Sequence, residues 1–183
     1  MRCPICNSTN TRPIKGPYHY IECGLDYVYL KGVPYLHCKD CRDNIVAIPR
    51  EQELLGLIAK HITLSQRHLV PDEIRFLRAL VGWSQAKLAK ELAVTRLTVT
   101  RWESGAQTPR IQADVLLRLV WLQEYTSQIR ADTSGAMPKG VLAQFDAVRD
   151  RLRSTIAAIK KCPAPPKSVA RMTIDVKRDL VAA

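Results

Sequence analysis

Two Cys-x-x-Cys pairs occur early in the chain, in "MRCPIC" and in "CKDC". Each pair can present two thiolates from one tight turn, and two such turns can close a tetrahedron around zinc at Zn–S distances of about 2.3 Å. The sequence therefore predicts a structural zinc site made of Cys3, Cys6, Cys38 and Cys41. Because residues 1–48 contain few apolar residues, we expect the metal to supply much of the stability of this segment.

Other cysteine chemistry is less favoured by the pattern. A thioredoxin-like redox pair needs a βαβ setting, which the sequence does not predict, and a catalytic zinc keeps an open position that four thiolates do not leave. We therefore expect no enzyme, with a CxxC redox or zinc enzyme as a remote alternative. Cys23 and Cys162 stand alone and are expected to be ordinary thiols, while His19 or His37 could replace a cysteine in a variant site.

A second informative stretch, "WSQAKLAKELAVTRLTVTRWESG", spans residues 83–105 and has the pattern of a helix-turn-helix. Ala89 is the small residue expected where the two helices cross, and Thr95 is placed to cap the second helix. The apolar residues expected to face inward are Leu88, Leu92, Val94, Val99 and Trp102. The alternative is an ordinary helical hairpin with a basic outer face.

The second helix of such a motif enters the major groove with its early residues aimed at base edges. Arg96 and Arg101 are expected on its outward side, and arginine can bind guanine O6 and N7 through two hydrogen bonds. Leu97 is unusual at a base-facing position, although it could contact a thymine methyl group. Ala93 lies in the turn, where glycine commonly adopts a left-handed conformation that costs other residues about 1–2 kcal/mol.

The elements around the cysteines are expected to be short strands and turns in a zinc domain over residues 1–48. "YVYLKGVPYLHC" predicts a hairpin that leads into Cys38 and spans the gap between the cysteine pairs. Residues 49–70 are expected to be a helix starting at Pro49, followed by a linker. The apolar side of this helix is formed by Leu54, Leu55, Ile58 and Ile62.

Residues 71–130 are expected to form the helix-turn-helix domain. Pro71 and Gly82 bound its first helix, Ser84 caps the next, Gly105 ends the following one, and Thr108 caps a long helix with Pro109 at its first position. Residues 131–183 are a C-terminal extension with a linker, an amphipathic helix over 140–161 and a short strand at "RMTIDVK". The predicted fold is therefore mainly α, with a small β zinc module.

Charge points to a polyanionic partner. Lys and Arg exceed Asp and Glu by two in residues 1–65, by four in residues 66–130 and by five in residues 131–183, for a net charge of +11. No apolar run approaches a membrane span, since Arg118 interrupts "VLLRLVWL". Met1 is followed almost at once by the first cysteine pair, which leaves no room for a signal peptide, so we expect a cytoplasmic protein.

The stretch "SQAKLAKELAVTRLTVTRWESGAQTP" closely resembles the Xre/Cro repressor-like helix-turn-helix. Together with "MRCPIC", "YLKGVPYLHCKDC" and "LVPDEIRFLRALVGWSQ", the architecture resembles the MqsA/YgiT-type zinc-binding antitoxins over residues 1 to about 125. The resemblance implies a zinc-ribbon-like module that contacts a toxin and a five-helix domain that dimerises and binds a palindromic operator. The tail beyond residue 130 departs from the family pattern.

The resemblance also implies roles for individual residues. The metal falls to the four cysteines named above, and base reading falls to Arg96, Leu97 and Arg101. Phosphate or secondary contacts with double-stranded DNA fall to Gln85, Lys87, Thr98 and Thr100. The leading hypothesis is a repressor that is the antitoxin of a toxin–antitoxin pair. The alternative is a free-standing regulator whose zinc domain binds another protein.

We expect a homodimer, because one recognition helix covers only a half-site and two-fold dimers match palindromes. The apolar stripes of residues 111–125 and 141–159 are the predicted seams. The second stripe could equally pack within one chain.

Overall fold

The computed structural model describes residues 2–14, 16–48, 50–132, 151, 154, 156–159, 166 and 168–179. The chain divides into two compact units, one made of Met1–Gly56 with Val169–Ala183 and the other of Leu57–Ser168. The sequence predicts a domain boundary after residue 48 and a C-terminal extension over residues 131–183. The structure divides the chain differently, because a C-terminal strand pairs with a strand of the first unit.

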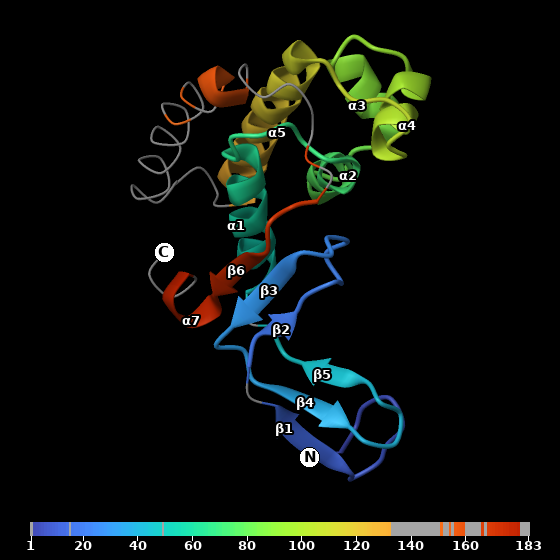
Figure 1. The fold of residues 1–183 in the computed structure, drawn as a ribbon, viewed down its shortest axis with the longest axis vertical. Coiled ribbons are helices and arrows are strands. Elements are labelled where there is room, and N and C mark those ends of the chain that lie inside the picture. The colour runs from blue at the N-terminus through green and yellow to red at the C-terminus, as the bar shows by residue number, and fades with distance from the viewer. Residues whose placement is uncertain are drawn as a thin grey trace. The chain divides into compact units, whose positions relative to one another are not determined.

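The first unit contains a three-stranded antiparallel sheet in the order β1-β4-β5 (Figure 1), formed by Thr11–Ile14, Tyr35–Cys38 and Asn44–Val46. Thr11, the first residue of β1, lies opposite Cys38, the last residue of β4. The first cysteine pair precedes β1, and the second follows β4. Because the strands are antiparallel, both cysteine pairs lie at the same end of this sheet.

A second sheet in the same unit has the order β2-β3-β6, formed by Tyr18–His19, Val28–Lys31 and Met172–Asp175. β2 is antiparallel to β3, whereas β6 is parallel to it, with Val28 opposite Met172 and Lys31 opposite Asp175. The short helix α7 (Val176–Asp179) follows β6. The strand predicted at "RMTIDVK" is therefore confirmed.

The predicted hairpin over "YVYLKGVPYLHC" is wrong. Its two halves form β3 and β4, which belong to different sheets. β2 and β6 occupy the two edges of β3, and β1 and β5 occupy those of β4, so neither strand has an edge left for the other. The two sheets are linked instead by side chains, since the rings of Tyr18 and Tyr35 lie 5.1 Å apart.

α1 (Glu51–Thr63) crosses the division between the units, and α2 (Pro71–Leu80), α3 (Gln85–Glu91), α4 (Arg96–Glu103) and α5 (Ile111–Asp132) follow it. Four helices therefore lie between residues 71 and 132, and a fifth can only come from outside this range. Of the helix expected over 140–161, residues 151, 154 and 156–159 are helical, and the others lie outside the described residues, as does most of the 141–159 stripe.

Most of the predicted helix boundaries are confirmed. Pro71 starts α2, Gly82 follows it with a φ of +68°, and the side chains of Ser84 and Thr95 accept hydrogen bonds from the backbone at the starts of α3 and α4. The cap predicted at Thr108 is wrong. α5 begins at Ile111, and its first intrahelical bond joins the Asp114 N–H to the carbonyl of Arg110 at 3.0 Å.

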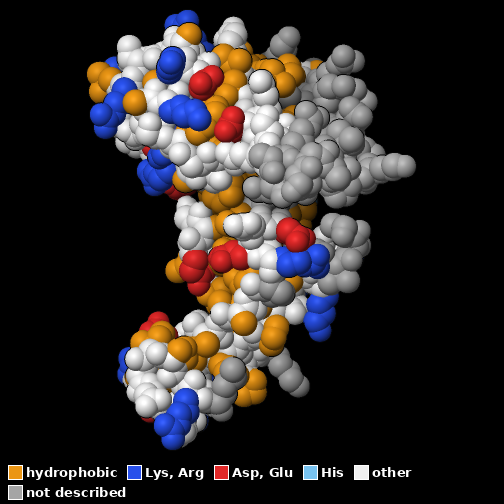
Figure 2. All heavy atoms as spheres, turned by 180° about the vertical axis from the view of Figure 1, so that it is seen from behind, with side chains coloured by type: hydrophobic (Ala, Val, Ile, Leu, Met, Phe, Trp, Pro, Cys, Tyr) orange, Lys and Arg blue, Asp and Glu red, His pale blue; other side chains and the backbone are white. Residues whose placement is uncertain are grey.

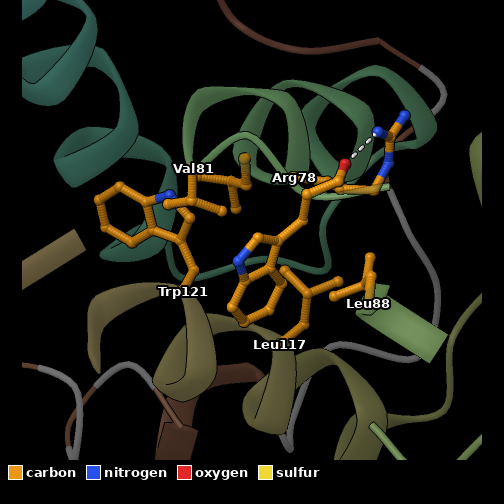
Figure 3. A pocket seen from close by; sticks show the side chains of 7 residues that line it. Arg78, Val81, Leu88, Leu117 and Trp121 are labelled. Atoms are coloured by element: carbon orange, nitrogen blue, oxygen red, sulfur yellow. Dashed lines mark hydrogen bonds between the residues drawn. The ribbon is translucent and has the colours of Figure 1, made fainter. Parts of the chain in front are cut away.

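The core of the second unit confirms the inward-facing residues. α4 packs against α2 and α3, and Leu88, Ala89, Leu92, Val99 and Trp102 are buried while Val94 is half-buried. Figure 3 shows Val81, Leu88, Leu117 and Trp121 turned toward one another. The space left between them is about 10 Å³, which is too small for an organic ligand.

Arg118 has a role that its sequence position did not reveal. Its side chain is fully buried, and its Nε donates to the Oδ1 of Asp114, one helical turn earlier, at 2.6 Å. Its guanidinium also donates to the carbonyls of Ile62, Thr63, Ser65 and Arg67. The last carbonyls of a helix have no partner within the helix, so Arg118 supplies donors to the C-terminal end of α1 and to the segment that follows it.

Among the described helices, none combines the length and the apolar character needed to cross a bilayer.

Candidate metal centre and nucleic-acid interface

The four predicted cysteines come together at one end of the β1-β4-β5 sheet. Their Sγ atoms all lie within 4.8 Å of one another, with Cys3 3.7 Å from Cys41 and Cys6 3.6 Å from Cys38. A tetrahedral site with Zn–S bonds of about 2.3 Å has S···S edges of about 3.8 Å. The four thiols are therefore spaced to bind one metal ion, and their number and softness fit zinc.

The two cysteine turns share one backbone design. The N–H of the first cysteine in each pair donates to the carbonyl five residues later, from Cys3 to Ser8 at 2.8 Å and from Cys38 to Asp43 at 2.9 Å. The residue after each second cysteine has a left-handed backbone, with a φ of 59° at Asn7 and 63° at Arg42. Each turn thus brings two sulfur atoms to the same side of the backbone.

The pKa values of the thiols reflect backbone hydrogen bonds and the closeness of the four sulfur atoms. The pKa of Cys3 is lowered to about 7, mainly because the backbone N–H of Cys6 stabilises its thiolate. The pKa of Cys41 is raised to about 12, because burial and the three neighbouring thiols outweigh the hydrogen bond from the backbone N–H of Asp43. Four thiolates this close repel one another, and a divalent cation bound between them removes that cost.

The other thiol and imidazole groups considered as ligands lie outside this cluster. Cys23 donates to the carbonyl of Tyr20 at 3.2 Å. The ring of His19 stacks on Tyr29 at 4.4 Å, and that of His37 contacts the amide oxygen of Asn44 at 3.1 Å. Cys162 lies outside the described residues.

The turn between α3 and α4 explains how the sequence accommodates Ala93. The Val94 N–H donates to the carbonyl of Ala89 at 2.9 Å, and the Ala93 N–H donates to that of Lys90 at 3.2 Å. These two bonds form a Schellman motif, whose residue after the helix cap has a left-handed backbone. Ala93 takes that position with a φ of 52°. The turn therefore has the backbone conformation that usually requires glycine, although the residue is alanine.

One side of α4 carries the residues expected to read bases. Arg96, Leu97, Thr100 and Arg101 are exposed, and they follow the i, i+1, i+4, i+5 spacing of one helical face, whereas Val99 and Trp102 are buried. Leu97 is 57% exposed, which is unusual for a leucine in a folded unit. Within the described part of the chain, the guanidinium groups of Arg96 and Arg101 make no hydrogen bond or ion pair, so their donors remain available.

The remaining predicted contact residues are partly engaged within the motif. Thr98 takes part in the cap of α4 through Thr95, with the two Oγ1 atoms 2.8 Å apart. Gln85 accepts a hydrogen bond from Thr100 Oγ1 at 3.2 Å and donates one to Glu103 at 2.9 Å. The Lys87 ammonium lies 4.6 Å from the centre of the Trp83 ring.

An ion pair with a buried carboxylate, which the sequence pattern did not single out, holds one of these contact residues. Arg78 of α2 donates to the carboxylate of Glu103 in α4 at 2.5 Å, and Glu103 is 4% exposed. Through Glu103 the pair also holds the amide of Gln85. Figure 2 shows Lys and Arg side chains spread over the surface formed by α3 and α4, with fewer acidic side chains between them.

Comparison with known protein families gives a match for one part of the chain. Residues 74–119 match a helix-turn-helix family model. The match runs from α2 into α5 and includes every residue predicted to contact DNA. It supports a DNA-binding transcriptional regulator. The comparisons with curated proteins and with solved structures give no match.

Proposed function

We propose that this protein is a sequence-specific, zinc-containing repressor that reads operator DNA with α4. The observation that carries the proposal is the exposed side of α4, where Arg96 and Arg101 present guanidinium groups that have no partner among the described residues, from a helix-turn-helix whose inner residues are buried. Arginine in this position suits bidentate bonding to guanine. Gln85, Lys87, Thr98 and Thr100 supply phosphate or secondary contacts. The protein acts by binding, without a catalytic role.

The zinc ion has a structural role in this proposal. Bound by Cys3, Cys6, Cys38 and Cys41, it would join two turns that are far apart in the sequence and leave no coordination position open for a substrate. The surrounding sheet has only three short strands, so a metal link supplies stability that a small core cannot. Such a module is zinc-ribbon-like.

The test is a binding titration on a duplex selected from a random pool by the wild-type protein and on a scrambled duplex, each at two salt concentrations. Arg101→Ala should lose about 1–3 kcal/mol of discrimination while keeping weak nonspecific binding. Lys87→Ala should weaken binding to both duplexes and lower the salt slope by about one. Equal losses on both duplexes for Arg101→Ala would show that α4 does not read bases.

The proposed repressor is a homodimer on a palindromic operator. In the 111–125 stripe, Leu117 and Trp121 are buried, but Leu116 and Leu119 are 40% and 43% exposed, one helical turn apart. Those two leucines fit a seam between two copies. Light scattering at micromolar concentration tests this, and a monomer for the wild-type protein contradicts it.

We further propose that the regulated operon encodes a toxin, which the zinc-containing unit neutralises. The arrangement of a four-cysteine module before a helix-turn-helix supports this role. The test is co-expression with the product of the neighbouring reading frame. Expressed by itself, that product should arrest growth, and this protein, when co-expressed, should bind it and relieve the arrest. If that frame encodes no such protein, the role is that of a free-standing regulator.

A further inference from the structure

Asp40 lies in the second cysteine turn, and its side chain reaches the first. Its Oδ2 accepts a hydrogen bond from Ser8 Oγ, and its Oδ1 accepts one from Asn10 Nδ2 at 3.0 Å. Ser8 closes the first cysteine turn through its carbonyl. One carboxylate therefore joins two turns that are separated by about thirty positions in the chain.

Backbone hydrogen bonds extend this link on both sides. The Asn10 N–H donates to Ser8 Oγ at 2.9 Å, and the Lys39 N–H donates to the Asn10 carbonyl at 3.0 Å. Ser8 and Asn10 are thus held to the second turn through both backbone and side chains. Asp43 occupies the same place in the second turn as Ser8 does in the first. Within the described residues, its side chain makes no hydrogen bond or ion pair. Asp43 therefore offers a matched control.

We propose that Asp40 is a positioning residue for the metal: it holds the two cysteine pairs at binding separation and slows release of the ion. The inference rests on the zinc centre proposed above. The ligands come from two turns, and the ion leaves when the turns separate. The carboxylate opposes that separation directly, because its two acceptors are bonded to the opposite turn. Groups that orient metal ligands typically change metal affinity by 10–100-fold when removed.

The experiment measures zinc release from the full-length, zinc-loaded protein into an excess of a chelating indicator dye. Asp40→Ala should release zinc about 10–100-fold faster than wild type, and Asp43→Ala should stay within about two-fold. Asp40→Asn should remain near wild type, because its amide keeps an acceptor for Asn10 and gains a donor for Ser8. Ser8→Ala removes one of the two hydrogen bonds to Asp40, together with the bond from the Asn10 N–H, and should give an intermediate rate.

Cobalt substitution separates positioning from loss of the site. The cobalt-loaded Asp40→Ala protein should keep the absorption spectrum of a tetrahedral four-thiolate site while its metal exchanges faster. Equal release rates for Asp40→Ala and Asp43→Ala overturn the positioning role. A wild-type protein that takes up no zinc overturns the metal centre itself, which is a different result. If Asp40→Ala does not fold, comparison of Ser8→Ala with Asp43→Ala decides the question in the same way.

Discussion

Ala93 follows the C-cap of α3 and has a left-handed backbone, which costs a residue with a side chain about 1–2 kcal/mol relative to glycine. Glycine loses more backbone entropy on folding, so only part of this cost is recovered when it replaces alanine. We expect Ala93→Gly to raise the free energy of unfolding of the second unit, Leu57–Ser168, by about 1 kcal/mol. This unit is called the helical unit below. Urea unfolding followed by circular dichroism measures it.

The matched control for this change is Ala86→Gly. Ala86 is exposed within α3, so glycine there should lower stability by about 1 kcal/mol. The same substitution should thus have opposite signs at positions seven residues apart. A loss of stability at both positions would contradict the Schellman geometry assigned to the turn.

Glu103 should make the stability of the helical unit depend on pH. Burial alone would raise the pKa of its carboxyl group, but hydrogen bonds from Arg78 and Gln85 outweigh burial and lower it. The folded pKa therefore lies below the unfolded one, and the stability from the ionised form is present above the unfolded pKa and is lost as pH falls through the folded pKa.

Glu103→Gln should accordingly lower the free energy of unfolding by about 3 kcal/mol at pH 7, because Arg78 loses a buried partner. The difference from wild type should shrink as the pH falls below about 4. Urea unfolding of both proteins at neutral and acidic pH measures this. A difference that is constant with pH would show that the ionised carboxylate is not the stabilising form.

Among the elements, the connection between α1 and α2 depends most on one side chain. The carboxylate of Asp114 bonds Arg118 and accepts the Leu69 N–H at 2.8 Å, while the Arg118 guanidinium donates to carbonyls of residues 62–67. Arg118→Met keeps a similar volume but removes the guanidinium donors from these carbonyls, and it leaves the buried Asp114 carboxylate with the Leu69 N–H but without its arginine partner. We expect a loss of about 3–5 kcal/mol in the free energy of unfolding.

Arg110→Met is the control for this prediction, because Arg110 is exposed at the start of α5. It should change stability by about 0.5 kcal/mol or less. Thermal melting followed at 222 nm compares the two variants. Similar melting temperatures would mean that water replaces the guanidinium at the end of α1.

The helices of the second unit were largely predictable because their signals are local. Several helix ends are each marked by a residue that acts within a few positions, namely Pro71, Gly82, Ser84 and Thr95. The cysteine site was predictable because two CxxC pairs supply the four ligands that a structural zinc site needs. Arg118 was missed as a structural residue, although Asp114 one turn earlier on an apolar helix is a signal of a buried pair.

The sheets were less predictable because their partners are distant. The local pattern of residues 27–38 is that of two strands around a turn, and it gives no sign that β6 competes for an edge of β3. Pairing with a strand more than 140 positions away depends on tertiary packing, with Leu30 opposite Ile174 and both side chains buried.

At the scale of the whole molecule, metal removal should affect the two units unequally. The four cysteines that would bind the metal lie in the turns beside the β1-β4-β5 sheet, whereas the helical unit has its own core. Chelation or Cys38→Ser should unfold that sheet while most of the far-UV helical signal and its cooperative melting persist. A single melting transition that shifts with chelator would contradict this independence.

Cys23→Ser is the control for metal removal, since Cys23 lies outside the four-thiol cluster. It should leave the zinc content at about one ion per chain. Cys38→Ser should lower that content and release the metal at lower chelator concentration. Atomic absorption on the purified proteins gives the stoichiometry.

The parallel pairing of β6 with β3 has a consequence for synthesis on the ribosome. Val28 and Leu30 emerge early, but the strand that covers their edge is made about 140 residues later, which takes about 7–28 seconds at 5–20 residues per second. The helical unit can therefore complete its fold before the first unit does, which reverses the usual N-terminal-first order. During that interval the nascent chain presents an open strand edge with apolar side chains. A protein made this way benefits from early metal capture by the cysteine turns or from a chaperone that covers the edge.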